Sequence, residues 1–132
     1  MKRFGLSAEE RIKNKIDFDK LYSAGRVILS ANRKIKAIYS AEKNYSGGNI
    51  LIAFAVSSKA GKAVWRNRLR RLLRTAYRLN KENLLKLCLL KKIVLKIIFS
   101  PNQMNEKNFQ KIKLFDIMPD VKDVMFQLER SL

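Results

Sequence analysis

The side chains with the clearest chemical purpose lie between Lys59 and Arg78, a stretch that holds eight cations and no acidic residue. Placed on a helix at roughly 100° per residue, its basic side chains occupy one arc and its apolar side chains the opposite arc. The apolar arc holds Trp65, Leu69, Leu72, Leu73, Ala76 and Leu79. Guanidinium groups fork onto phosphate oxygens and stack on bases, so this pattern predicts contact with a nucleic acid.

A solvated charged face is the alternative explanation for such a run of charge. A helix stabilised by ion pairs three or four residues apart would mix acids with its bases, and this stretch does not. Asn67, in the middle of the basic arc, can both donate and accept a hydrogen bond. That property suits a ribose 2′-hydroxyl or a base edge, and it favours RNA modestly over DNA.

Catalysis by the protein itself finds little support in the residue types. The chain has no histidine, a single cysteine at Cys88, and no glycine-rich phosphate loop. The carboxylate pairs Glu9 with Glu10 and Asp17 with Asp19 fall inside expected helices, where capping and surface roles explain them. We therefore expect no catalytic residue, no protein-bound metal or other cofactor, and no small-molecule substrate.

The charge balance points to a polyanionic partner. The 132 residues include 29 basic and 11 acidic side chains, for a net charge of +18, which is typical of nucleic-acid binders. A membrane-surface protein is a weaker alternative, because strand patterns surround the basic helix and no uncharged stretch approaches the ~20 residues of a membrane span. One cysteine and no secretory signal pattern make the cytoplasm the expected location.

Hydrophobic periodicity predicts the elements that must position the basic face. We expect one domain over residues 1–132, with helices at about 15–24 and 63–79, strands at 35–41, 50–56 and 93–99, and a final helix with Pro119 in its first turn. The first two strands suggest an antiparallel pair. Strand, helix and strand then make a crossover unit in an α/β sandwich.

Other segments are less regular. Ser7 and Glu10 have the spacing of a helix capping box, and residues 106–112 have weak helical character. Residues 84–90 fit either further helix or a connector. Val121, Val124, Met125 and Leu128 form an apolar stripe that we expect to close the core.

The motif Lys59-x-Gly61-x-Ala63-x-x-Arg66-Asn67-Arg68-Leu69-x-Arg71-x-x-Arg74 closely resembles the Arg-Asn-Arg signature of the bacterial ribonuclease P protein subunit. A second stretch, Arg11-Ile-Lys-x-x-x-Asp17-Phe18-x-x-Leu21-Tyr22-x-x-Gly25, is similar to the first helix of that family. The resemblance implies an α+β fold, a small sandwich like a ribosomal-protein domain. In it, helices pack on a four-stranded, mostly antiparallel sheet, with a left-handed β-α-β crossover.

The resemblance also implies a function. The partner would be a catalytic RNA that uses magnesium to remove the 5′ leader of precursor tRNA, with the protein as a monomer in a 1:1 complex. The face toward the catalytic RNA would comprise Lys59, Lys62, Arg66, Asn67, Arg68, Arg70, Arg71 and Arg74. The single-stranded leader would lie in a cleft at Phe18, Tyr22, Lys36 and Tyr39. The alternative is a structural RNA-binding protein of the ribosomal kind with no processing role, which would need no leader cleft.

Overall fold

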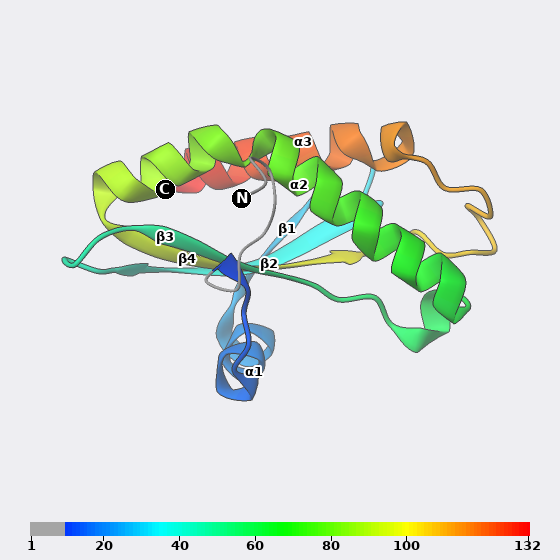
Figure 1. The fold of residues 1–132 in the computed structure, drawn as a ribbon, viewed down its shortest axis with the longest axis horizontal. Coiled ribbons are helices and arrows are strands. Elements are labelled where there is room, and N and C mark those ends of the chain that lie inside the picture. Colours follow the sequence, from blue (N-terminus) through cyan, green and yellow to red (C-terminus); the bar gives the residue numbers. More distant parts are fainter. Residues whose placement is uncertain (1–9) are drawn as a thin grey trace.

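A four-stranded sheet with helices on both faces forms the body of the protein (Figure 1). The computed structural model describes residues 10–132. Its elements in chain order are α1 (Lys15–Ala24), β1 (Arg26–Leu29), β2 (Ile35–Lys43), β3 (Asn49–Phe54), the short 3₁₀ helix η2 (Ser58–Ala60), α2 (Ala63–Lys91), β4 (Ile93–Pro101) and α3 (Leu114–Ser131). The predicted α+β class is confirmed, while the expected helix start at Ser7 lies outside the described residues.

The strand order is β1-β2-β4-β3. β2 is antiparallel to both β1 and β4, whereas β3 is parallel to β4, so the sheet is mostly antiparallel as predicted. The expectation that β2 and β3 pair directly is wrong, because β4 lies between them. β4 is apolar on both faces, with Phe99 and Ile98 both fully buried, and this composition suits a central strand better than an edge.

The two faces of the sheet bury separate apolar clusters. α2 and α3 cover one face, and α1 lies across the other (Figure 1). Side chains alternate along β4, so Ile97 and Phe99 join the larger cluster under α2 and α3, while Ile98 joins a smaller cluster under α1. Each helix layer is therefore held by its own apolar contacts.

The predicted bounds of α1 are confirmed. The Asn14 side chain accepts a hydrogen bond from the backbone N–H of Ile16 at 2.8 Å, which caps the start of the helix. At the other end, the Gly25 N–H donates to the Leu21 carbonyl at 2.9 Å. A Cβ at Gly25 would lie 2.5 Å from that carbonyl oxygen and 2.6 Å from Ile38 Cγ2, so the close approach of α1 to β2 requires glycine here.

α2 is longer than predicted, because it continues past Leu79 to Lys91. The side-chain amide of Asn80 donates to the Ala76 carbonyl at 2.7 Å, one turn earlier in the same helix. Leu84 and Cys88 are fully buried, and their burial outweighs the lower helix propensity of Asn80 and Asn83. Leu79 is 50% exposed instead of buried, and Tyr77 fills the core. Burial raises the pKa of the Cys88 thiol to about 11.

α3 begins at Leu114, five residues before Pro119, so the prediction that proline lies in the first turn is wrong. The Lys113 N–H donates to Asp116 Oδ2 at 2.7 Å, and this bond sets the start of the helix. The segment at 106–112 forms turns, not a helix. The apolar stripe of α3 is buried against the sheet and α2, as expected.

Candidate nucleic-acid interface

The turn that leads into α2 is shaped by close packing at Gly61. The Ser57 hydroxyl accepts from the Lys59 N–H at 3.2 Å and caps the short helix η2. A Cβ at Gly61 would lie 2.8 Å from Glu106 Cβ and 2.9 Å from the Trp65 ring, although its backbone is simply extended. The glycine therefore lets the chain pass tightly beneath the segment at 102–113.

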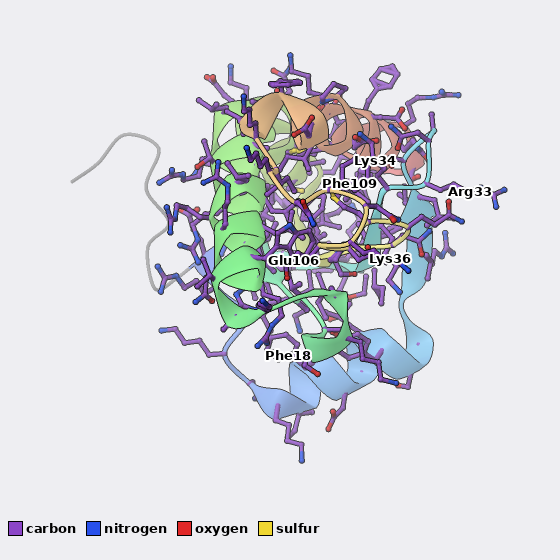
Figure 2. All side chains as sticks on the ribbon, turned by 90° about the vertical axis from the view of Figure 1, so that its right-hand side faces the viewer. Phe18, Arg33, Lys34, Lys36, Glu106 and Phe109 are labelled. Carbon is purple, nitrogen blue, oxygen red and sulfur yellow. The ribbon has the colours of Figure 1, made fainter. Side chains whose placement is uncertain are left out.

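That segment, which we call the connector (residues 102–113), fastens the first turns of α2. The Lys62 N–H donates to Glu106 Oε1 at 2.8 Å, the Trp65 indole N–H donates to the Phe109 carbonyl at 2.7 Å, and Arg68 Nε donates to the Ile112 carbonyl at 2.7 Å. Figure 2 shows Glu106 and Phe109 beside the start of α2. The direction of the basic side chains is thus set by contacts 44 residues away in sequence.

The basic side chains of α2 lie on its outer side, as the helical pattern predicted. We define the arginine face as the eight residues Lys59, Lys62, Arg66, Asn67, Arg68, Arg70, Arg71 and Arg74, of which five are exposed and three partly so. Within residues 10–132, no carboxylate forms an ion pair with any of them. An extended positive surface whose cations are not paired with carboxylates is suited to a nucleic-acid backbone.

Local hydrogen bonds orient part of this face. Arg66 Nε donates to the Gly61 carbonyl at 3.1 Å, and Arg70 donates to the Asn67 side-chain oxygen. These bonds leave the other donors of each guanidinium group available. Arg68 differs from its neighbours, since its Nε is turned toward the connector and also has a structural role.

Arg74 lies at the inner edge of the face. Its guanidinium carbon is 6.0 Å from the centre of the Phe54 ring on β3. Burial, together with the positive charges of Arg11, Arg78 and Arg70, lowers the pKa of Arg74. An anion bound near this residue would relieve that repulsion.

A second surface is an open groove of about 480 Å³ on the α1 side of the sheet. We call it the α1 groove. Tyr22 on α1, Lys36 on β2 and Lys59 on η2 all line it, so the sequence-predicted residues Tyr22 and Lys36 are brought together. The remaining wall comes from Ala55, Val56, Ser57, Ala60, Ser100, Pro101, Asn102, Met104 and Asn105. A groove lined by an exposed aromatic ring and two cations is suited to single-stranded nucleic acid.

Phe18 and Tyr39 do not occupy equivalent places. Phe18 is partly buried against the apolar cluster under α1 and is not among the residues that line the α1 groove. Tyr39 is only 6% exposed and packs in the core under α2 and α3. Positions 36 and 39 point to opposite faces of β2, because side chains alternate along a strand. The structure thus does not bring Tyr39 into the α1 groove.

Several contributors to these surfaces were missed from the sequence. Lys96 on β4 forms an ion pair with Asp17 on α1 at 3.1 Å, which ties the helix to the sheet. Met104 and Asn105 of the connector line the α1 groove, and Arg11 lies close to Arg74. All these contacts join segments distant in the chain, and no local pattern predicts them.

Two features of the described residues concern other classes of site. No helix in that part of the chain combines the length and apolar character needed to cross a membrane. Among the same residues, no three histidine, cysteine or carboxylate side chains gather in a way that could hold a metal ion.

Comparison with known proteins shows the family to which the chain belongs. Residues 6–116 match the family model described as "Ribonuclease P". The ribonuclease P protein component of Desulfovibrio desulfuricans is 36% identical over 84 residues, which span 64% of this chain and 62% of that protein.

Solved structures share the fold. The RNase P protein of Staphylococcus aureus is 24% identical, with a TM-score of 0.66 over 90% of this chain and 94% of that one. The Thermotoga maritima protein is 21% identical, with a TM-score of 0.63 over 92% of this chain and 96% of that one. At these identities the likeness supports the architecture alone.

Proposed function

The chain belongs to the ribonuclease P protein family, and from that premise we propose that it is the protein subunit of a ribonuclease P ribonucleoprotein. In this role it binds a catalytic RNA and the 5′ leader of precursor tRNA. The holoenzyme then removes the leader by magnesium-dependent cleavage and leaves the mature tRNA 5′ end.

The observation that supports this role best is the meeting of two different surfaces at Lys59. This lysine belongs to the arginine face and also lines the α1 groove with Tyr22 and Lys36. A structural RNA-binding protein would need the arginine face but not a groove with an exposed aromatic ring beside it. The paired surfaces suit a protein that holds two RNAs at once, and the family match favours the same interpretation.

Each surface has its own chemistry. On the arginine face, guanidinium groups neutralise and hydrogen-bond the phosphates of the structured catalytic RNA. In the α1 groove, Tyr22 stacks on a base while Lys36 and Lys59 attract the backbone, and neither contact requires a particular base. A subunit that serves many precursors needs such sequence tolerance.

The cleavage step belongs to the RNA partner in this proposal. The polar and aromatic side chains of the two surfaces are cations, amides, hydroxyls and one aromatic ring, groups that bind phosphate and bases. Magnesium acts with the RNA, and the protein joins it as a monomer in a 1:1 complex. Its contribution is to position the precursor and to reduce electrostatic repulsion between two polyanions.

Reconstitution tests the proposal. Ribonuclease P RNA and a precursor tRNA are incubated at low magnesium with and without the protein, and leader release is measured. We expect cleavage to be stimulated, because the protein's cations neutralise RNA phosphates that magnesium ions would otherwise neutralise. Unchanged cleavage at every protein concentration would contradict the proposal.

An arginine-face variant sharpens the test. Arg70→Ala should weaken assembly with the catalytic RNA by about tenfold, the usual size of one lost charged contact. Lys122→Ala is the matched control, since Lys122 is an exposed cation on α3 outside both surfaces. Equal losses in the two variants would show that net charge, not the arginine face, governs binding.

A further inference from the structure

A small hollow of about 140 Å³ lies at the outer edge of β3, separate from the α1 groove. Two arginines and one phenylalanine line it, together with three aliphatic residues. The lining residues are Arg11, Ile12, Ile52, Ala53, Phe54 and Arg74. We call it the Arg11 pocket, and it shares no residue with the α1 groove.

Contacts on both sides of Arg11 fix its position. Glu10 forms an ion pair with Lys81 of α2 at 2.9 Å, and the Ile12 N–H donates to the Ile52 carbonyl of β3 at 3.0 Å. Ile12 is buried, and Arg11 itself pairs with Ile52 in a parallel bridge. The chain therefore holds Arg11 beside Arg74 by anchors on two different elements.

This arrangement concentrates positive charge. Arg11 and Arg74 line the pocket together, and the positive charges of Arg70 and Arg78 also act on Arg74. The carboxylate of Glu10, next to Arg11 in the chain, is paired with Lys81. Among the described residues, Nε of both Arg74 and Arg78 is shielded from solvent and has no hydrogen-bond partner. Like charges held together cost free energy, and an anion bound among them would recover it.

We propose that the Arg11 pocket binds one phosphodiester group of the catalytic RNA, so that the RNA contact extends from α2 onto the edge of β3. The guanidinium groups of Arg11 and Arg74, from two segments of the chain, match the oxygens of a phosphate, and the Arg74 guanidinium carbon lies 6.0 Å from the centre of the Phe54 ring. The catalytic RNA is the occupant, because Arg74 is continuous with the arginine face while the α1 groove opens elsewhere. The inference rests on the proposed function.

The first test measures binding to ribonuclease P RNA as a function of salt. Arg11→Ala should weaken assembly about tenfold and reduce the slope of log affinity against log salt by about 0.7 to 0.9, as expected for one lost phosphate contact. Arg11→Lys should restore most of the slope but not all of the affinity, because an ammonium group lacks the planar fork. Lys13→Ala, which removes an exposed cation two residues away, is the control.

A double-mutant cycle tests whether Arg11 and Arg74 share one phosphate. The loss in Arg11→Ala with Arg74→Ala should be clearly smaller than the product of the single losses, whereas Lys13→Ala with Arg74→Ala should be multiplicative. Thermal unfolding of each variant checks that the fold persists. A multiplicative result for the first pair would overturn the shared pocket.

Two further outcomes would overturn the inference. Arg11→Ala with wild-type affinity and slope would exclude the contact, and normal assembly with weaker precursor binding would assign the pocket to the leader. Failure of the proposed function is distinguishable, because the wild-type protein would then not stimulate cleavage at all. If the wild-type protein stimulates cleavage and Arg11→Ala assembles normally, only the proposed role of the Arg11 pocket is excluded.

Discussion

At the scale of single residues, two aromatic side chains on α1 have different surroundings. Tyr22 is 57% exposed and lines the groove, whereas Phe18 packs partly into the cluster formed by Ile12, Leu21, Ile38 and Ile98. Substitution at Phe18 would thus mix a binding effect with a packing effect. Tyr22 isolates the binding effect.

We expect Tyr22→Ala to weaken precursor binding by fivefold or more, since stacking of one base on an aromatic ring contributes ~1–3 kcal/mol. Its free energy of unfolding should change by less than about 0.5 kcal/mol, because the ring is largely exposed. Phe18→Ala should lower that free energy by about 1–3 kcal/mol. Equilibrium binding of a precursor to assembled holoenzyme, with denaturant unfolding of each variant, measures both effects.

A control keeps the Tyr22 prediction specific. Tyr22→Phe retains the ring, so it should bind the precursor almost as well as the wild type. Assembly with the catalytic RNA should be normal in both variants. A Tyr22→Ala protein that binds precursor normally would exclude stacking in the groove.

At the scale of elements, hydrogen bonds to the connector hold the first turns of α2 in place. Glu106 accepts from the Lys62 N–H, and Trp65 and Arg68 donate to connector carbonyls. Glu106 is also a negative charge beside a positive surface, so its hydrogen bond and its charge have opposite expected effects on RNA binding.

Two substitutions at Glu106 separate these effects. Glu106→Gln keeps an acceptor for Lys62 but removes the charge, so RNA affinity should be equal to or higher than wild type at low salt. Glu106→Ala loses the acceptor, and it should lower the free energy of unfolding by ~1 kcal/mol, as loss of a helix cap does. It should also loosen the start of α2, which amide hydrogen exchange of residues 62–66 would detect. Equal exchange in both variants would contradict the role of this hydrogen bond.

At the scale of the whole molecule, a net charge of +18 favours binding to RNA but destabilises the folded protein through charge repulsion. Among residues 10–132 only four ion pairs offset the repulsion. The isolated protein should therefore be stabilised by salt, which screens like charges, even though salt weakens its RNA binding.

We expect the midpoint of thermal unfolding to rise by several degrees between about 0.05 M and about 0.5 M salt, since 1 kcal/mol corresponds to roughly 2–5 °C for a chain of this size. Arg71→Glu should raise the midpoint at low salt by relieving repulsion on α2, and it should weaken assembly with the catalytic RNA. Arg71→Ala is the comparison variant: it removes the charge without reversing it, so it should have a smaller effect in both measurements. A midpoint that is independent of salt would show that charge repulsion does not limit stability.

The sequence by itself determined those features that depend on neighbours in the chain. The bounds of α1, the apolar and basic sides of α2, the strand character of residues 93–99 and the Arg-Asn-Arg motif all follow from local spacing and residue type. Net charge and the family resemblance belong to the same class of information. Together they predicted a helix with basic side chains on its outer side, and contact of this face with RNA stays a prediction.

Only the tertiary structure decided how distant segments meet. It inserted β4 between β2 and β3, turned Tyr39 into the core while Lys36 reached the α1 groove, and placed Arg11 beside Arg74. It also extended α2 to Lys91 by burying Leu84 and Cys88. The physical reason is that strand order, strand register and helix length depend on long-range pairing and burial, which no local periodicity encodes.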